Sequence, residues 1–221
     1  MYLPDHFAEN DTATLHDLIA AFPLGTLVTV GSDGLNANHI PFLLATDTGE
    51  HGALLGHVAR ANRVWQDFST EHEALVIFQG PSAYVSPNWY PTKAETHRHV
   101  PTYNYAVVHA YGQLVIHDDE KWLRGFVGRL TKRMEMSQPR PWKMAHAPQD
   151  FLRQMLGEIV GIEIPLSRLV GKWKVSQNRL PIDREGAAEG LRTTGQPEAM
   201  AMADLIAAIR DHAGAIVKRT N

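Results

Sequence analysis

The stretch YNYAVVHAYGQLVIH, residues 103–117, decides the fold class, because it is the longest strand signal in the chain. Its aromatic and β-branched residues favour an extended strand, and Gly112 is expected to break that strand. Pro41 should interrupt another strand, because proline cannot donate a ladder hydrogen bond. The remaining strands are predicted at residues 24–30, 35–44, 52–57, 74–80 with a continuation over 82–87, 158–165 and 168–176.

Helical patterns lie between these strands. In residues 11–22, apolar side chains recur at the spacing of one helix face, and Asp11 can cap the helix. Further helices are predicted at residues 59–68, after Asp118 or Asp119, and at 149–157, 184–192 and 197–212. Strands with interspersed helices predict an α+β protein built on a β-barrel.

The composition changes near residue 181, where the sequence becomes rich in alanine and helical in pattern. No linker, repeat or low-complexity tract precedes this change. We therefore expect residues 1–180 to form the barrel domain. Residues 181–221 should form a helical extension that packs on the same domain.

Charge and cysteine usage narrow the class of protein. The 221 residues carry a formal net charge of −3 and include no cysteine. Disulfides, thiolate metal sites and cysteine nucleophiles are therefore excluded, which fits a reducing cytoplasm. A slightly acidic chain is unlike most DNA-binding domains, which are basic overall. The first residues, MYLPDHFAEN, lack the pattern of a signal peptide, and no apolar run could span a bilayer. A cytoplasmic protein without membrane contact is expected.

The first polar segment that could carry chemistry is GHVARANRVW, residues 56–65. Here a strand is predicted to end and a helix to begin, so His57, Arg60 and Asn62 should cluster at a helix N-terminus. Free backbone N–H groups and a guanidinium together favour an anion such as a phosphate. The alternative is an ordinary solvated first turn with incidental charges.

The second segment is KWKVSQNR, residues 172–179. Lys172 and Lys174 are two positions apart on a strand and therefore point to the same face. With Arg179, they form a basic stretch without an acidic neighbour, which could lie beside an anionic cofactor. An exposed edge strand guarded by lysines is the alternative.

The third segment, residues 84–105, combines aromatic side chains with amides. Rings can stack on a planar heterocycle while amides hydrogen-bond to its edge, so this composition suits such a ligand. Packing in an aromatic core is the alternative. The residues concerned are Trp89, Tyr90, Tyr103 and Tyr105 with Asn88 and Asn104.

Common enzyme signatures are absent. The chain contains no HExxH, GxSxG, GxxxxGK[ST] or GxGxxG motif, which argues against common hydrolases, P-loop NTPases and Rossmann dehydrogenases. His97, His99 and His109, with His39, could supply metal ligands, but no carboxylate stands near the H-R-H pair at a familiar spacing. We therefore expect no metal.

Six segments in this order resemble the PaiB-type FMN-binding negative transcriptional regulators. The resemblance covers about 180 residues, and its specificity comes from the combination of segments rather than from any one of them. Tyr103 departs from the family, where tryptophan is expected, but it keeps an aromatic surface. The segments are MYLPDHF (1–7), NHIPFLL (38–44), GHVARAN (56–62), YVSPNWYP (84–91), VPTYNYAVVHAYG (100–112) and KVSQNR (174–179).

This resemblance implies an antiparallel split β-barrel of Greek-key type with peripheral helices, and FMN bound at the interface of a homodimer. It places His57, Arg60 and Asn62 near the flavin phosphate. Asn38, His39 and Ile40 would run beside the ring, and Tyr103 and Asn104 would reach the cofactor from a neighbouring strand. Four further residues would close the site, from the same subunit or from its partner: Lys172, Gln177, Asn178 and Arg179.

Three functions agree with these features. The first is an FMN-dependent oxidoreductase that acts on an unidentified small substrate, with Lys172 stabilising negative charge on the reduced ring. The second is a flavin-sensing transcriptional regulator without turnover. DNA remains a possible partner, although the helix pair 184–192 and 197–212 is poor in base-reading side chains. The third is haem binding, because related split barrels can hold haem and the chain has 12 histidines.

Overall fold

The computed structural model describes residues 1–209 as two compact units. Unit 1 comprises Met1–Glu9, Gly80–Ala106 and the chain from Lys172 onward, and unit 2 comprises Asn10–Gln79 and Val107–Gly171. Three strands contribute residues to both units: β6 (Ala74–Val85), β7 (Thr102–Gly112) and β9 (Ile159–Lys174). The domain boundary expected at residue 180 falls inside unit 1 and stays a prediction, and residues 210–221 lie outside the described part.

Unit 2 is organised around antiparallel strands. β2 (Leu24–Gly31) pairs with β3 (Gly34–Pro41) over its whole length, from Leu24↔Pro41 to Gly31↔Gly34. β3 ends at Pro41, and the chain resumes pairing in β4 (Leu43–Ala45), as the proline predicted. β5 (Ala53–Ala59) lies between β4 and β9. Across the sheet, the strand order is β3-β2-β6-β7-β9-β5-β4.

The expected break at Gly112 is present. β7 ends at this residue, and β8 (Val115–His117) then pairs with β9. A Cβ at Gly112 would lie 2.1 Å from the carbonyl oxygen of Pro165, so only glycine allows this close approach of backbone to backbone. The glycine marked the end of the strand in the sequence, and the close approach of β9 to Gly112 explains why a glycine is needed there.

Two strands were predicted at residues 158–165 and 168–176, but the structure has the single strand β9, Ile159–Lys174. Pro165 pairs with Ala53 within it, and the next residue, Leu166, donates its backbone N–H to the carbonyl of Gly52 at 2.9 Å. Pairing with the neighbouring strand β5 therefore keeps the backbone extended on both sides of Pro165. The strand predicted at residues 74–80 and its continuation over 82–87 likewise form one strand, β6, which ends at Val85.

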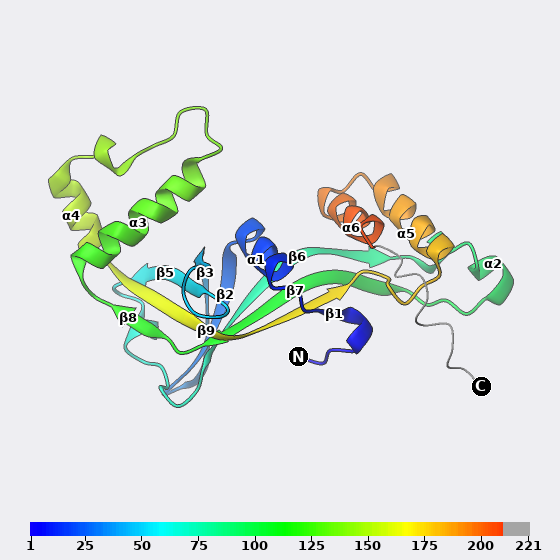
Figure 1. The fold of residues 1–221 in the computed structure, drawn as a ribbon, viewed down its shortest axis with the longest axis horizontal. Helices are drawn as coiled ribbons and strands as arrows, with labels where there is room; N and C mark the ends of the chain where they lie inside the picture. The colour runs from blue at the N-terminus through cyan, green and yellow to red at the C-terminus, as the bar shows by residue number, and fades with distance from the viewer. Residues whose placement is uncertain (210–221) are drawn as a thin grey trace. The chain divides into compact units, whose positions relative to one another are not determined.

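Three helices of unit 2 match the sequence pattern: α1 (Thr12–Ala21), α3 (Glu120–Glu135) and α4 (Gln149–Gly157). The side chains of Asp11 and Asp119 cap α1 and α3 by accepting backbone N–H groups of Thr14 and Trp122. α3 and α4 pack against each other (Figure 1). Within residues 1–209, no helix has both the length and the apolar content to cross a membrane.

The helix predicted at residues 59–68 is wrong. β5 continues to Ala59, which pairs with Ile159, and only a short 3-10 turn, Arg63–Trp65, follows. Asn62 caps this turn through its side chain, and the carboxylate of Asp67 accepts hydrogen bonds from the N–H and hydroxyl of Ser32 at 2.8 and 2.9 Å. These long-range contacts hold the chain out of a continuous helix, so the helix N-terminus that the sequence predicted within residues 59–68 is absent.

Unit 1 contains strand β1 (Ala8–Glu9), α2 (Lys93–Thr96) and the helix pair α5 (Pro181–Thr193) and α6 (Pro197–Ala207). Two 3-10 turns, Asp5–Phe7 and Pro87–Trp89, complete it. α5 and α6 lie side by side (Figure 1), and their facing apolar residues are buried with Val175 and Ala83. α6 ends before the predicted limit at residue 212, and positions 210–212 lie outside the described residues.

α5 presents a flat glycine face to the segment that follows β6. A Cβ at Gly190 would lie 2.2 Å from Cγ of Trp89, and one at Gly186 would lie 2.2 Å from the Trp89 carbonyl oxygen. Because the two glycines are one turn apart, the Trp89 segment can lie directly on the helix. This contact brings Thr92 to the first turn of α5, where it hydrogen-bonds Asp183.

Replacing one of these glycines should separate the segment from the helix. We expect Gly190→Ala to lower the free energy of unfolding by about 1–3 kcal/mol, because the indole must move. The matched control is Gly125→Ala in α3, where no atom lies within 4 Å of the added methyl group. The control should raise stability by about 0.5–1 kcal/mol. Chemical denaturation followed by circular dichroism compares them, and shifts of the same sign would contradict the close-packing argument.

Candidate functional site

In unit 2, two amide side chains of the predicted site lie together. The Asn62 amide donates to the Asn38 side-chain oxygen at 2.7 Å, and Asn38 donates in turn to Asn36 at 2.9 Å. Alternation along β3 puts Ile40 on the same side as Asn38 and His39 on the other. Ile40 is buried and His39 is exposed. The structure therefore brings Asn38 and Asn62 together, while His39 faces away from them.

The Arg60 guanidinium is fully engaged within unit 2. Both of its terminal nitrogens donate to the Asp118 carboxylate, at 2.6 and 3.1 Å, and Nε donates to the Gly157 carbonyl at 2.6 Å. A further bond runs from Nη2 to the Ile159 carbonyl at 3.1 Å. Four of the five N–H donors of arginine are thus used. The guanidinium also holds the pKa of Asp118 below its usual range through their hydrogen bond.

His57 is held in an apolar setting on β5. Its ring makes an edge contact with Phe126, with centroids 5.8 Å apart, and its Nδ1 is buried without a hydrogen-bond partner among the described residues. Burial lowers the pKa of His57, because removal from water disfavours the charged form. A buried ring nitrogen without a partner is a position at which a ligand could supply the missing hydrogen bond.

A histidine outside the predicted site has a more defined environment. His117 on β8 shares a hydrogen bond of 2.7 Å with Glu163, and its ring stacks on Trp122 with centroids 4.2 Å apart and planes 8° from parallel. No sequence pattern predicts the contact between His117 and Glu163, because the two residues belong to different strands. Within residues 1–209, no three histidine, aspartate or glutamate side chains gather as a metal-ligand set.

In unit 1, Lys172 is 7% exposed and has an unusual set of partners. Its ammonium donates to the backbone carbonyl of Tyr2 at 3.0 Å and lies 5.6 and 5.3 Å from the ring centroids of Tyr2 and Tyr105. No ion pair joins it to a carboxylate within the described residues. Among residues 1–209, the contacts that compensate this buried charge are therefore a carbonyl and two aromatic faces.

Lys172 belongs to a cluster of three cations with Lys174 and Arg179. Burial lowers the pKa of Lys174, and the charges of Lys172 and Arg179 lower it further. Lys174 is hydrogen-bonded to the Thr102 hydroxyl and the Tyr103 carbonyl, neither of which is charged. The basic stretch predicted from the sequence is thus a real cluster of neighbouring cations.

The turn that follows β9 is tightly built. Ser176 has a φ of 69°, which is uncommon for a residue with a side chain. Its hydroxyl accepts a hydrogen bond from the buried Asn104 amide at 2.8 Å, and the Gln177 side chain bonds the backbone of Val175 and Trp173. Asn104 and Gln177, both predicted site residues, therefore shape the turn that carries Arg179.

The other predicted residues of unit 1 differ in exposure. Tyr103 is 59% exposed, and its ring meets Tyr84 edge to face with centroids 6.2 Å apart. Asn178 is exposed at the tip of the turn. Tyr90 is buried and Tyr105 is partly buried, so their rings serve packing as well as contacts with Arg179 and Lys172. Tyr84 and Tyr103 therefore present an exposed aromatic surface, and Tyr2 beside Lys172 is exposed as well.

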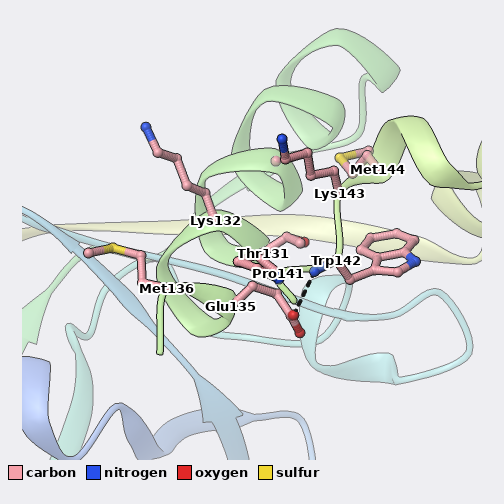
Figure 2. Close-up of a pocket in the computed structure, with 9 residues that line it drawn as sticks. Thr131, Lys132, Glu135, Met136, Pro141, Trp142, Lys143 and Met144 are labelled. Atoms are coloured by element: carbon pink, nitrogen blue, oxygen red, sulfur yellow. Dashed lines mark hydrogen bonds between the residues drawn. The ribbon is translucent and has the colours of Figure 1, made fainter. Parts of the chain in front are cut away.

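A cavity that the sequence did not indicate lies in unit 2. It has a volume of about 510 Å³ and lies between the last turns of α3 and the segment Pro141–Met144 (Figure 2). Glu135 closes one side by accepting the backbone N–H of Trp142 at 2.8 Å. None of the predicted site residues lines it, because it is built from a stretch that reads as an ordinary loop. Its walls are largely apolar, with Met136, Trp142 and Met144 among them.

Comparison with known proteins shows the family. Residues 1–168 match the family described as "Putative FMN-binding domain". The chain belongs to this FMN-binding family. The Bacillus subtilis protein named protease synthase and sporulation protein PAI 2 is 30% identical, over 93% of this chain and 96% of its own. An uncharacterised protein of Aspergillus fumigatus is 31% identical over the same shares. The predicted PaiB-type membership is therefore confirmed.

Solved structures with the same fold have much lower identity. The flavocytochrome Anf3 from Azotobacter vinelandii is 12% identical and superposes with a TM-score of 0.55, covering 76% of this chain and 69% of its own. The FAD and heme binding protein from Mycobacterium smegmatis is 16% identical with a TM-score of 0.53, covering 76% and 73%. The predicted α+β split β-barrel with peripheral helices is confirmed, and FMN is the cofactor that the family description names.

The residues of this FMN-binding chain fit that cofactor. FMN carries a phosphate dianion and a planar ring whose edge forms hydrogen bonds. The cation cluster of unit 1 lacks a negatively charged partner within the described residues, so an anion would relieve its mutual repulsion. Unit 2, taken by itself, holds neutral polar groups of the kind that can hydrogen-bond to a ring edge: the Asn38–Asn62 pair and Nδ1 of His57, which has no partner among the described residues. The individual site assignments and the homodimer stay predictions.

The lowered pKa of His57 has a consequence for acid stability. The unfolded chain binds a proton near the ordinary histidine pKa of 6.5, whereas folded His57 resists protonation to lower pH. Stability should therefore fall as pH decreases below about 6.5. We expect His57→Gln to reduce this loss of Tm between pH 7 and pH 5. His39→Gln, at an exposed position, is the control and should keep the wild-type pH dependence. Equal profiles for all three proteins would contradict the buried neutral state.

Proposed function

We propose that this protein is an FMN-dependent oxidoreductase in which the cation cluster Lys172, Lys174 and Arg179 recognises negative charge on the flavin. The observation that carries the proposal is the environment of Lys172, which is 7% exposed and forms no ion pair with a carboxylate in residues 1–209. Burying an unpaired charge is costly, so such a group points to a ligand that supplies the opposite charge.

Bound FMN would supply two-electron redox chemistry between a donor and a small substrate. The task of the chain is then to bind, orient and stabilise charge. Lys172 can hold a positive charge against negative charge that develops during reduction, and its aromatic neighbours limit access of water to it. An ammonium held in place in this way stabilises a reduced ring more than an oxidised one, which favours electron uptake.

Arg60 can bind the flavin phosphate only if the phosphate replaces Asp118 as its partner. Because four of its five donors are used by Asp118 and two carbonyls, it can offer a phosphate little without exchanging Asp118. Support for anion recognition therefore rests mainly on unit 1, where the hydrogen bonds of Lys172, Lys174 and Arg179 go to neutral partners. Arg60→Ala tests the alternative directly, since a strong loss of FMN affinity would move the phosphate to unit 2.

The decisive variant is Lys172→Met, which keeps the length of the side chain and removes its charge. We expect FMN to bind at least about tenfold more weakly, because one charge-assisted contact is lost. At the same time, the flavin-free protein should become more stable by roughly 1–3 kcal/mol, because an uncompensated buried charge is gone. Flavin absorbance and fluorescence titrations measure the first effect, and thermal unfolding of the flavin-free protein measures the second.

Lys121→Met is the matched control, because Lys121 is an exposed lysine in α3. It should change neither FMN affinity nor stability. Unchanged FMN affinity in Lys172→Met would remove the observation on which the proposal rests. Turnover is tested separately by adding NADH or NADPH to the FMN-loaded protein under anaerobic conditions. If neither bleaches the flavin and no acceptor reoxidises chemically reduced protein, FMN is bound without oxidoreductase activity.

Negative regulation of transcription is the alternative function of the same FMN-binding chain. It predicts an operator complex whose formation changes with FMN occupancy and weakens with added salt. The described part of the helix pair gives it little support, because Ala199, Met202, Ala203 and Ile206 of α6 are buried in packing. The homodimer, the substrate, the cytoplasmic location and DNA binding all remain predictions.

A further inference from the structure

A continuous line of hydrogen bonds runs through unit 1 from Arg179 to Asp183. Nη1 of Arg179 lies 3.4 Å from Nδ1 of His99, and Nε2 of His99 lies 2.9 Å from the Thr92 hydroxyl oxygen. The Thr92 hydroxyl donates to Oδ2 of Asp183 at 2.7 Å, and the Thr92 backbone N–H donates to Oδ1 at 3.1 Å. The line ends on a carboxylate that is 1% exposed.

The chemistry of the end groups fixes the direction of every proton in this line. Arginine can only donate and an ionised aspartate can only accept. Nδ1 of His99 must therefore accept from Arg179, which leaves the hydrogen of the neutral ring on Nε2. That hydrogen is donated to the Thr92 oxygen, whose own hydrogen points to Asp183. A single arrangement, with neutral His99 protonated on Nε2, satisfies all the groups at once.

Asp183 is a suitable anchor for the line. It occupies the first turn of α5, where backbone N–H groups favour a negative charge, and Thr92 supplies two donors. The glycine face of α5 holds the Thr92 segment in place through Trp89. The guanidinium of Arg179 also lies 5.0 Å from the ring centroid of Tyr90, whose ring contacts His99 at 4.9 Å. Arg179 therefore contacts the rings of Tyr90 and His99, and Thr92 links His99 to the Asp183 carboxylate.

We propose that Asp183, Thr92 and His99 are positioning residues that fix the orientation of Arg179 without neutralising it. Two uncharged groups separate the guanidinium from the carboxylate, and His99 uses one donor of Arg179. The others stay available for an anion beside Lys172 and Lys174. This inference rests on the proposed role of the cation cluster in FMN recognition, and it adds the residues that orient Arg179 toward the ligand.

The charged and titratable groups that face His99 in unit 1 are Arg179, Asp183 and Tyr90. Nε2 of His99 lies 4.0 Å from Oδ2 of Asp183, with the Thr92 hydroxyl hydrogen-bonded to both. A proton added at Nδ1 would remove the acceptor for Arg179 and place two cations side by side. The line therefore operates only while His99 is neutral.

The test is a double-mutant cycle on FMN affinity with Thr92 and Arg179. Thr92→Val keeps the shape of the side chain but removes the hydroxyl, and we expect FMN to bind roughly three- to tenfold more weakly. Thr92→Ser restores the hydroxyl and should bind FMN within about twofold of wild type. Arg179→Ala alone should weaken binding by about tenfold. In the Arg179→Ala background, Thr92→Val should have no further effect, because the group that it positions is absent.

Thr194→Val is the control for loss of a threonine hydroxyl elsewhere in unit 1. Thr194 donates to the Leu191 carbonyl at 2.7 Å and takes no part in the line, so this variant should leave FMN affinity unchanged. If Thr92→Val weakens FMN binding equally in the wild-type and Arg179→Ala backgrounds, Thr92 does not act through Arg179 and the inference is overturned.

A second readout does not require FMN. Long-range ¹⁵N–¹H correlation spectra of the wild-type protein distinguish the two neutral tautomers of each histidine. His99 should be a single Nε2–H tautomer, and Arg179→Ala should change its Nδ1 shift. A mixture of tautomers, or the Nδ1–H form, would overturn the positioning line. If the wild-type protein binds no FMN, the proposed function fails, and this spectrum still decides whether His99 positions Arg179.

Discussion

The cost of removing a charge from water governs where this molecule can hold a ligand. Asp183 and Lys172 are both almost fully buried in unit 1, at 1% and 7% exposure, yet their surroundings differ. Asp183 receives two hydrogen bonds from Thr92 and lies in the first turn of α5. Lys172 has one carbonyl and two aromatic rings. The negative charge is compensated by hydrogen bonds within unit 1, whereas the positive charge has no carboxylate partner within residues 1–209.

The same constraint is met differently in unit 2. Arg60 is paired with Asp118 and bonded to two carbonyls, and Asn62 is paired with Asn38. Two of the three side chains predicted to bind a phosphate there, Arg60 and Asn62, therefore already have hydrogen-bond partners within unit 2. What remains is His57, whose buried Nδ1 has no partner in the described residues and whose pKa is lowered by burial. Unit 2 therefore offers neutral hydrogen-bonding groups, which suit a ring edge better than a dianion.

Much of the fold could be predicted because its signals are local. Pro41 and Gly112 marked breaks in strands, and Asp11 and Asp119 marked the beginnings of helices. The helix expected at residues 59–68 failed because strand pairing at Ala59 and the Asp67–Ser32 bonds outweighed a local pattern. The proximity of Lys172 and Lys174 could be predicted, because two residues that are two positions apart on a strand point to the same face. The Asp118 partner of Arg60 and the Thr92–His99–Asp183 line join distant segments, and no spacing rule reveals such contacts.

The two arginines of the predicted site show how a fold can either use or preserve a positive charge. Nη2 of Arg60 lies 2.6 Å from Oδ1 of Asp118, and in such a direct ion pair the carboxylate cancels most of the positive potential that could attract an anionic ligand. Arg179 is also tied to an aspartate, but through a neutral imidazole and a hydroxyl. These two groups transmit orientation while they keep the carboxylate away from the guanidinium. An arginine that serves only stability gains from the first arrangement, and one that must meet an anion gains from the second.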